Sequence, residues 1–115
     1  MPNSEIIDRA LLQGYLDNLG SSVVQKMLDM YIGQSEIYLA DIQSAINEGS
    51  QAMWEQHTHK MKGAAGSVGV KQVHAHIMAI EKSSDNSVQK QRYLEELKQL
   101  NNQGITVFKQ WLATA

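Results

Sequence analysis

The sequence predicts an all-α fold, an antiparallel four-helix bundle with a short N-terminal cap helix. Apolar residues recur at three- and four-residue spacing along nearly the whole chain, which is the period of an amphipathic helix. The only proline is Pro2, so no proline interrupts the body of the chain. No segment combines period-two alternation with β-branched residues, which argues against a sheet. We expect residues 1–115 to form one domain, long enough to bury a core.

The first two predicted helices are separated by a glycine. Asp8 can cap the start of the first, short helix, and Gly20 stands where that helix would stop. A longer helix then opens at Ser21 or Ser22 and ends at Gly49, in the sequence "NEGS". The inward positions of the first are Ile7, Leu11, Leu12, Tyr15, Leu16 and Leu19, and those of the second are Val24, Met27, Leu28, Tyr31, Tyr38, Leu39, Ile42, Ala45 and Ile46.

Three further helices complete the expected bundle. Ser50 is the predicted N-cap of a helix over residues 51–67, and Gly69 ends that helix or links it to the next one. A fourth helix is predicted over residues 71–82, followed by a loop, "SSDNS", and a last helix over about residues 88–113. Short connections between helices of this length favour antiparallel neighbours.

Composition excludes several classes of function. The chain has no cysteine, so it can form neither disulfides nor cysteine-based metal sites, and this is compatible with the cytoplasm. Its net charge is −2 and it has no long basic run, which argues against a nucleic-acid partner. No apolar run approaches the roughly 20 residues of a membrane span, so we expect no direct membrane insertion. The N-terminus "MPNSEIIDRA" lacks the apolar core of a signal peptide.

The stretch "HTHKMKGAAGSVG", residues 57–69, places two histidines and several glycines where the pattern calls for a helix. A glycine inside a helix costs roughly 1 kcal/mol relative to alanine, so its presence needs a reason. On a helical wheel centred on Met61, His57 falls on the buried side and His59 lies opposite, at about 160°. Gly63 and Gly66 share the outer face with His59.

The glycines can serve an exposed histidine. Gly63 lies one turn after His59, so the missing side chain uncovers the ring and lets another protein's backbone approach. Gly66 keeps the neighbouring surface flat. Lys62, three residues after His59, can bring a mobile positive charge beside the ring, which suits a phosphate on the imidazole better than a metal ion. The pattern therefore indicates a histidine that is phosphorylated by a docked partner.

Two other interpretations stay open at this point. His59 can be an ordinary surface histidine, and the bundle can be a structural or metal-binding one. A metal or cofactor bundle carries its histidines inward on facing helices. Only His57 points inward here, and we expect it to be a packed core residue. His74 and His76 are two residues apart, about 200° on the wheel, and cannot chelate one metal. Glu81, Glu95 and Glu96 are expected to be solvated, and no metal site is predicted.

The stretch "HKMKGAAGSVG", residues 59–69, resembles the signature of histidine phosphotransfer (HPt) domains. That signature has a histidine, a lysine three residues on, and glycines four and ten residues on, matched by His59, Lys62, Gly63 and Gly69. The resemblance spans the whole chain, and "YLDNLG" and "VFKQWLATA" look similar to the HPt domains at the C-terminus of hybrid sensor kinases. It implies a four-helix bundle with the acceptor midway along an exposed helix face.

The resemblance also implies a phosphorelay intermediate of a two-component system. Such a domain takes a phosphoryl group from a receiver aspartate and passes it to another, without ATP binding or autokinase activity. By position, His59 is the phospho-acceptor, Lys62 the charge beside the phosphate and Gly63 the steric clearance. Lys60 and Gly66 are expected at the partner-binding surface, with Lys60 steering an acidic receiver. No cofactor is expected on this chain, and Mg²⁺ belongs to the receiver.

The implied partners are response-regulator receiver domains. A hybrid sensor kinase in the same chain is a second implied partner, which would tether a cytoplasmic domain to an inner-membrane protein. The exposed faces of the first two helices are expected to share the receiver contact. The chain is expected to be a monomer.

Overall fold

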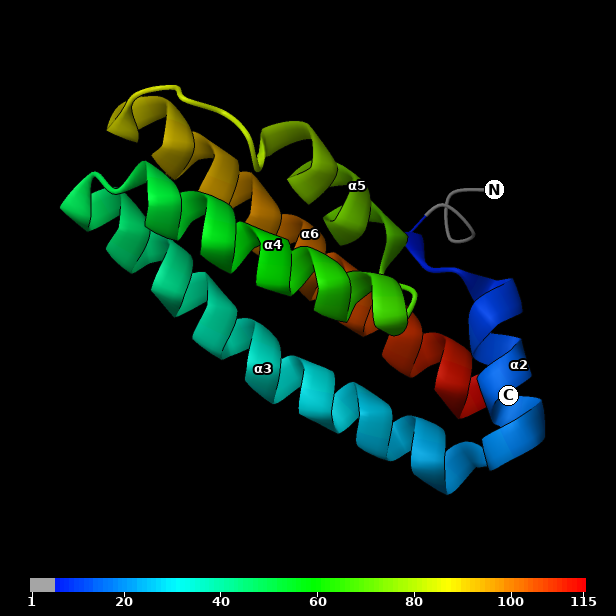
Figure 1. Cartoon of the computed structure of the whole chain (residues 1–115). Helices are drawn as coiled ribbons and strands as arrows, with labels where there is room; N and C mark the ends of the chain where they lie inside the picture. The colour runs from blue at the N-terminus through cyan, green and yellow to red at the C-terminus, as the bar shows by residue number, and fades with distance from the viewer. Residues whose placement is uncertain (1–5) are drawn as a thin grey trace.

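The computed structural model describes residues 6–115 and places them in an all-α arrangement (Figure 1). Helix α3 contacts α4 and α6, and α5 contacts the same two helices, so the four form a closed bundle. The chain reverses direction between successive helices of the bundle (Figure 1). The short helix α2 packs against α3 at one end. This is the predicted bundle with its cap helix, built from α2 (Arg9–Leu19), α3 (Ser21–Glu48), α4 (Gln51–Ser67), α5 (Lys71–Ile80) and α6 (Ser87–Thr114).

Side-chain caps fix the helix starts close to where the sequence predicts them. The side chain of Asp8 accepts a hydrogen bond from the backbone of Leu11, and Ser50 accepts one from Met53, both at 3.1 Å. Gly49 ends α3 in the left-handed conformation, with φ of 64°. Helix α5 ends at Ile80, two residues before the predicted end. None of the helices in residues 6–115 is long and apolar enough to cross a membrane.

The turn from α4 to α5 requires a glycine. Gly69 has a φ of 72°, a left-handed conformation that side chains other than glycine's rarely adopt. Its carbonyl accepts a hydrogen bond from the backbone N–H of Asp8 at 2.7 Å. The turn that follows α4 therefore also fixes the start of the cap helix α2.

The core contains a buried polar cluster that the apolar pattern does not predict. The hydroxyl of Tyr31 donates to Asn101 at 2.6 Å, and the amide of Asn101 donates to the hydroxyl of Ser35 at 3.0 Å. All three residues are at most 3 % exposed, and burial raises the pKa of Tyr31. These hydrogen bonds join α3 to α6 within the core of the bundle, whose largest fully buried side chains are Trp54 and Phe108.

Gly104 of α6 packs against Val70 at the α4–α5 turn, and replacing it with alanine should destabilise the fold. A Cβ atom there would lie 2.5 Å from Cγ1 of Val70, in a fully packed region. We expect Gly104→Ala to cost about 1–3 kcal/mol, as overpacked core positions do. Gly33→Ala, in mid-α3 with open space around its Cβ, is the matched control and should gain about 0.5–1 kcal/mol. Urea unfolding measures both. A Gly104→Ala variant as stable as Gly33→Ala would show that α6 moves freely away from Val70.

Candidate functional site

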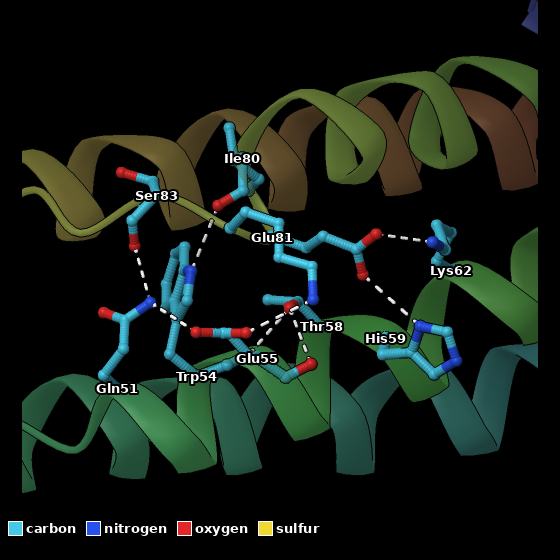
Figure 2. Close-up of polar contacts among 10 residues, drawn as sticks. Gln51, Trp54, Glu55, Thr58, His59, Lys62, Ile80, Glu81 and Ser83 are labelled. Atoms are coloured by element: carbon cyan, nitrogen blue, oxygen red, sulfur yellow. Dashed lines mark hydrogen bonds and ion pairs between the residues drawn. The ribbon is translucent and has the colours of Figure 1, made fainter.

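His59 lies midway along α4 with 71 % of its side chain exposed, as the helical wheel predicts. Its Nδ1 atom is 3.4 Å from Oε2 of Glu81, and its Nε2 atom points away from that carboxylate (Figure 2). The hydrogen-bond partners of the two ring nitrogens determine which of them carries the proton. An Nδ1–H facing the carboxylate leaves the lone pair on Nε2, on the open side of the ring.

Glu81 is more buried than the sequence predicts. It was expected to be solvated, but its side chain is only 11 % exposed. Glu81 follows the last residue of α5, and its backbone N–H donates to the carbonyl of Ile77 at 2.8 Å. One of its carboxylate oxygens accepts a hydrogen bond from Lys62 while the other faces His59 (Figure 2). The end of α5 thus brings a carboxylate against the outer face of α4.

The ion pair sets the charge state of the carboxylate. The hydrogen bond and charge of Lys62 hold the pKa of Glu81 below its usual value, and His59 adds a smaller lowering. Partial burial acts in the opposite direction and is outweighed. Glu81 is therefore ionised at neutral pH, and its carboxylate can accept a hydrogen bond from the Nδ1–H of His59.

The side chain of Lys62 is less mobile than the sequence predicts. It was expected as a mobile charge beside the ring, but its side chain is only 21 % exposed and its ammonium group is bound to Glu81. Lys62 and His59 contact the two oxygens of one carboxylate. The structure therefore brings the three side chains together in the order Lys62, Glu81, His59.

The two glycines of the outer face have different surroundings. A Cβ atom on Gly63 would meet nothing within 4 Å, so this position is open to a partner. A Cβ atom on Gly66 would lie 3.1 Å from the Cδ2 atom of His74. Gly66 is exposed, as expected for a flat outer face, and the absence of a side chain there also leaves room for the ring of His74 on α5. Lys60 is exposed, beside His59.

Comparison with known proteins identifies the family. The family model described as Hpt domain matches residues 26–104, which include the α4 site and most of the bundle. The chain belongs to the HPt domain family. HPt domains relay phosphoryl groups to and from receiver domains in two-component phosphorelays, and the protein is accordingly a phosphoryl carrier and not a kinase.

Two solved structures share the fold of this HPt domain. One is the histidine-containing phosphotransfer domain of ArcB from Escherichia coli, with a TM-score of 0.81, 23 % identity, and coverage of 99 % of this chain and 98 % of that one. The other is the histidine-containing phosphotransfer protein B (HptB) from Pseudomonas aeruginosa PAO1, with a TM-score of 0.82, 17 % identity and 96 % coverage of both chains. No curated protein sequence matches the chain.

The second histidine of α4 is largely buried in this HPt domain, as predicted. The side chain of His57 is 16 % exposed, and its Nδ1 atom lies 3.9 Å from Oδ2 of Asp41. Within residues 6–115 that buried Nδ1 atom has no hydrogen-bond partner. His57 therefore faces α3 and is far less accessible to a receiver than His59.

The histidines of α5 take no part in the site. The Nε2 atom of His76 lies 3.1 Å from the carbonyl oxygen of Tyr93 on α6, and His74 packs against Gly66. The described part of the chain contains no group of three or more histidine, aspartate or glutamate side chains that could hold a metal ion.

The ion pair of Glu81 makes part of the stability of the HPt domain dependent on pH. Because the pKa of Glu81 is lowered in the folded state, its contribution is complete above the ordinary glutamate pKa of 4.5 and is lost as the pH falls through the lower folded value. Glu81→Gln should therefore lower the free energy of unfolding at pH 7, and the difference from wild type should shrink below about pH 4.5.

Urea unfolding between pH 3 and pH 7 measures this effect. Glu36→Gln is the matched control, because Glu36 is exposed on α3 and has no ion pair within residues 6–115. A Glu81→Gln profile parallel to that of wild type would mean that the pair with Lys62 does not persist in solution.

Proposed function

We propose that His59 is the phospho-acceptor of this HPt domain, taking a phosphoryl group from a receiver aspartate and passing it to another. The observation that carries the proposal is the exposed ring, with Nδ1 against Glu81 and Nε2 directed outward (Figure 2). No other histidine within the described residues combines exposure of this degree with a carboxylate behind the ring. The open surface at Gly63 adds support, since a partner's backbone can approach there.

The geometry supports a simple transfer step. The lone pair of Nε2 attacks the phosphorus of the receiver's acyl phosphate, a bond forms between Nε2 and phosphorus, and the bond from phosphorus to the aspartyl oxygen breaks. The receiver's aspartate leaves as a carboxylate. The proton on Nδ1 stays on the ring, whose positive charge is then stabilised by Glu81 at 3.4 Å. The reverse sequence returns the group to a second receiver, and phosphoryl transfer needs this positioning and charge more than covalent machinery.

Lys62 has two roles in this proposal. It holds Glu81 in place, and its positive charge can stabilise a transferring phosphoryl group. We expect Lys62→Ala to slow transfer by about tenfold, on the order of 1 kcal/mol or somewhat more, without unfolding the domain. Lys109→Ala, on an exposed position of α6, should leave the rate unchanged. Stopped-flow or quench-flow transfer at low salt measures both, and a wild-type rate for Lys62→Ala would remove Lys62 from the mechanism.

An apolar groove between α3 and α4 extends the proposed receiver contact. Its lining includes Met27, Met30 and Gln34 from α3, with Ala64 and Ser67 from α4. Met30 is 69 % exposed, which is high for an apolar side chain. Ser67 lies one turn after Gly63, and its hydroxyl donates to the carbonyl of Gly63 at 2.9 Å, so the groove borders the open surface beside His59. A receiver centred on His59 would cover it, with Lys60 at the rim.

The wider assignment follows from the same resemblance. We propose that residues 1–115 form one HPt domain, that it acts as a cytoplasmic monomer, and that within its family it resembles the C-terminal HPt domain of the hybrid sensor kinase of aerobic respiration control. A hybrid kinase in the same chain would then supply one of the receivers. We propose neither a nucleic-acid partner nor direct insertion of this domain into a membrane.

The test is phosphoryl uptake from receivers of the source organism. Each receiver is phosphorylated with a radiolabelled phosphoryl group, freed of the donor and mixed with the domain and Mg²⁺. We expect rapid label transfer from at least one receiver, with the label acid-labile and base-stable as a phosphohistidine is. Transfer from none of the receivers, or an acid-stable label, would contradict the proposal.

A further inference from the structure

The turn between α5 and α6 is held by the same helix that carries His59. The indole Nε1–H of Trp54 on α4 donates to the carbonyl of Ile80 at 3.1 Å, and the side-chain amide of Gln51 donates to the carbonyl of Ser83 at 2.9 Å (Figure 2). Glu81 lies between these two carbonyls in the chain. Contacts from α4 therefore anchor the backbone on both sides of Glu81.

Burial makes the first of these anchors strong. Trp54 is fully buried, and a buried indole N–H is costly to leave without an acceptor. The ammonium group of Lys90 from α6 lies 5.3 Å from the centre of the Trp54 ring and donates to the side-chain oxygen of Gln51 at 2.6 Å. Both anchoring side chains are thus themselves held in place by a third helix.

Few contacts fix the orientation of the exposed His59 ring. Within residues 6–115 its only polar contact with a side chain is the one with Glu81. Because the ring is mostly exposed, packing does not fix its direction, and the carboxylate must do so. The position of that carboxylate depends on where the backbone of residues 80–83 lies against α4.

We propose that Trp54 and Gln51 are positioning residues for phosphoryl transfer, which hold the α5–α6 turn so that Glu81 meets Nδ1 of His59 and Nε2 stays free. The chain of contacts starts and ends on α4, so the acceptor and its support are fixed relative to one rigid element. This inference rests on the proposed role of His59, but its first observable, the protonation pattern of the His59 ring, does not require transfer.

The test compares the His59 ring between variants by ¹⁵N-detected imidazole NMR. Trp54→Phe keeps an aromatic ring in the core and removes only the N–H donor. Gln51→Met, at a partly exposed position, removes the second anchor with little change in size. Glu81→Ala provides the reference spectrum of a ring without its carboxylate. We expect both anchor variants to lose Nδ1-protonated tautomer relative to wild type, in the direction of Glu81→Ala.

Transfer kinetics provide the second measurement. We expect each anchor variant to transfer about 3- to 10-fold more slowly than wild type, since small displacements of a reacting group cost much of the rate. For the spectra, Tyr31→Phe is the matched control, because it removes a buried hydrogen bond in the α3–α6 interface and touches neither the turn nor Glu81. It should lower the unfolding free energy and leave the tautomer ratio of His59 at the wild-type value.

The outcomes separate this inference from the proposed function. Folded anchor variants with a wild-type His59 spectrum would overturn it, as would a Tyr31→Phe spectrum shifted as far as theirs. A Glu81→Ala spectrum identical to wild type would overturn it as well. If Trp54→Phe does not fold, the His59 spectrum of Gln51→Met alone tests the inference. Altered spectra in a domain that accepts no phosphoryl group would support the positioning and contradict only the role of His59.

Discussion

Replacing His59 with glutamine is expected to abolish phosphoryl acceptance and leave the helical fold intact. Glutamine has no nitrogen lone pair that can attack phosphorus, so the loss should be complete and not partial. The side chain is 71 % exposed, and substitutions at such positions usually change the free energy of unfolding by less than about 0.5 kcal/mol. Label uptake from a phosphorylated receiver and the circular dichroism spectrum measure the two halves of the prediction.

His57→Gln is the matched control on the same helix. Because the ring of His57 faces α3 and is 16 % exposed, this change should lower stability and retain transfer in the folded fraction. Uptake of acid-labile phosphate by His59→Gln at the wild-type rate would move the acceptor role to another histidine. A His57→Gln variant of unchanged stability would count against the packing role given to that residue.

Gly63→Leu should separate stability from function. Leucine forms helix better than glycine by nearly 1 kcal/mol, and a Cβ atom at this position meets nothing within 4 Å, so the free domain should be as stable or more stable. Helical side chains lean toward the N-terminus of the helix, so the leucine side chain would cover the turn that carries His59. A displacement of about 1 Å in a reacting pair can cost on the order of 100-fold in rate, and we expect a loss of that size.

Gly63→Ala is the graded control for this prediction. Alanine gives a similar gain in helix stability with a much smaller side chain. Transfer should therefore fall in the order glycine, alanine, leucine, while the melting temperatures of both variants stay at or above that of wild type. Unfolding of Gly63→Leu would mean that the position serves helix packing. Normal transfer would mean that the receiver docks elsewhere.

The sequence predicts the fold well because its signals are local. Asp8, Ser50 and Gly49 act within one turn of the residues that they cap, and apolar periodicity needs only neighbouring positions. The exposure of His59 also follows from one helix alone. The all-α bundle and the boundaries of α4 could be derived in this way.

The supporting side of the site could not be derived from local signals. Glu81 lies 22 positions after His59 and reaches it only because α5 folds back along α4. Its sequence neighbours give no sign of burial. The contact between Gly66 and His74 could not be predicted for a related reason: a helical wheel describes one helix and does not show which residue of another helix packs there. Apolar periodicity does not predict the burial of Ser35 and Asn101, because polar side chains do not contribute to that pattern.

The polar cluster of Tyr31, Ser35 and Asn101 limits which alternative packings the bundle can adopt. Helices α3 and α6 each have 28 residues, and their apolar side chains could still be buried after a slip of one turn, about 5.4 Å. The hydrogen bonds of the cluster would be broken by such a slip, and each polar group left buried and unpaired would cost about 1–3 kcal/mol. Sliding of α6 along α3 is thereby disfavoured, so the two longest helices, against which α4 and α5 pack, keep a single register.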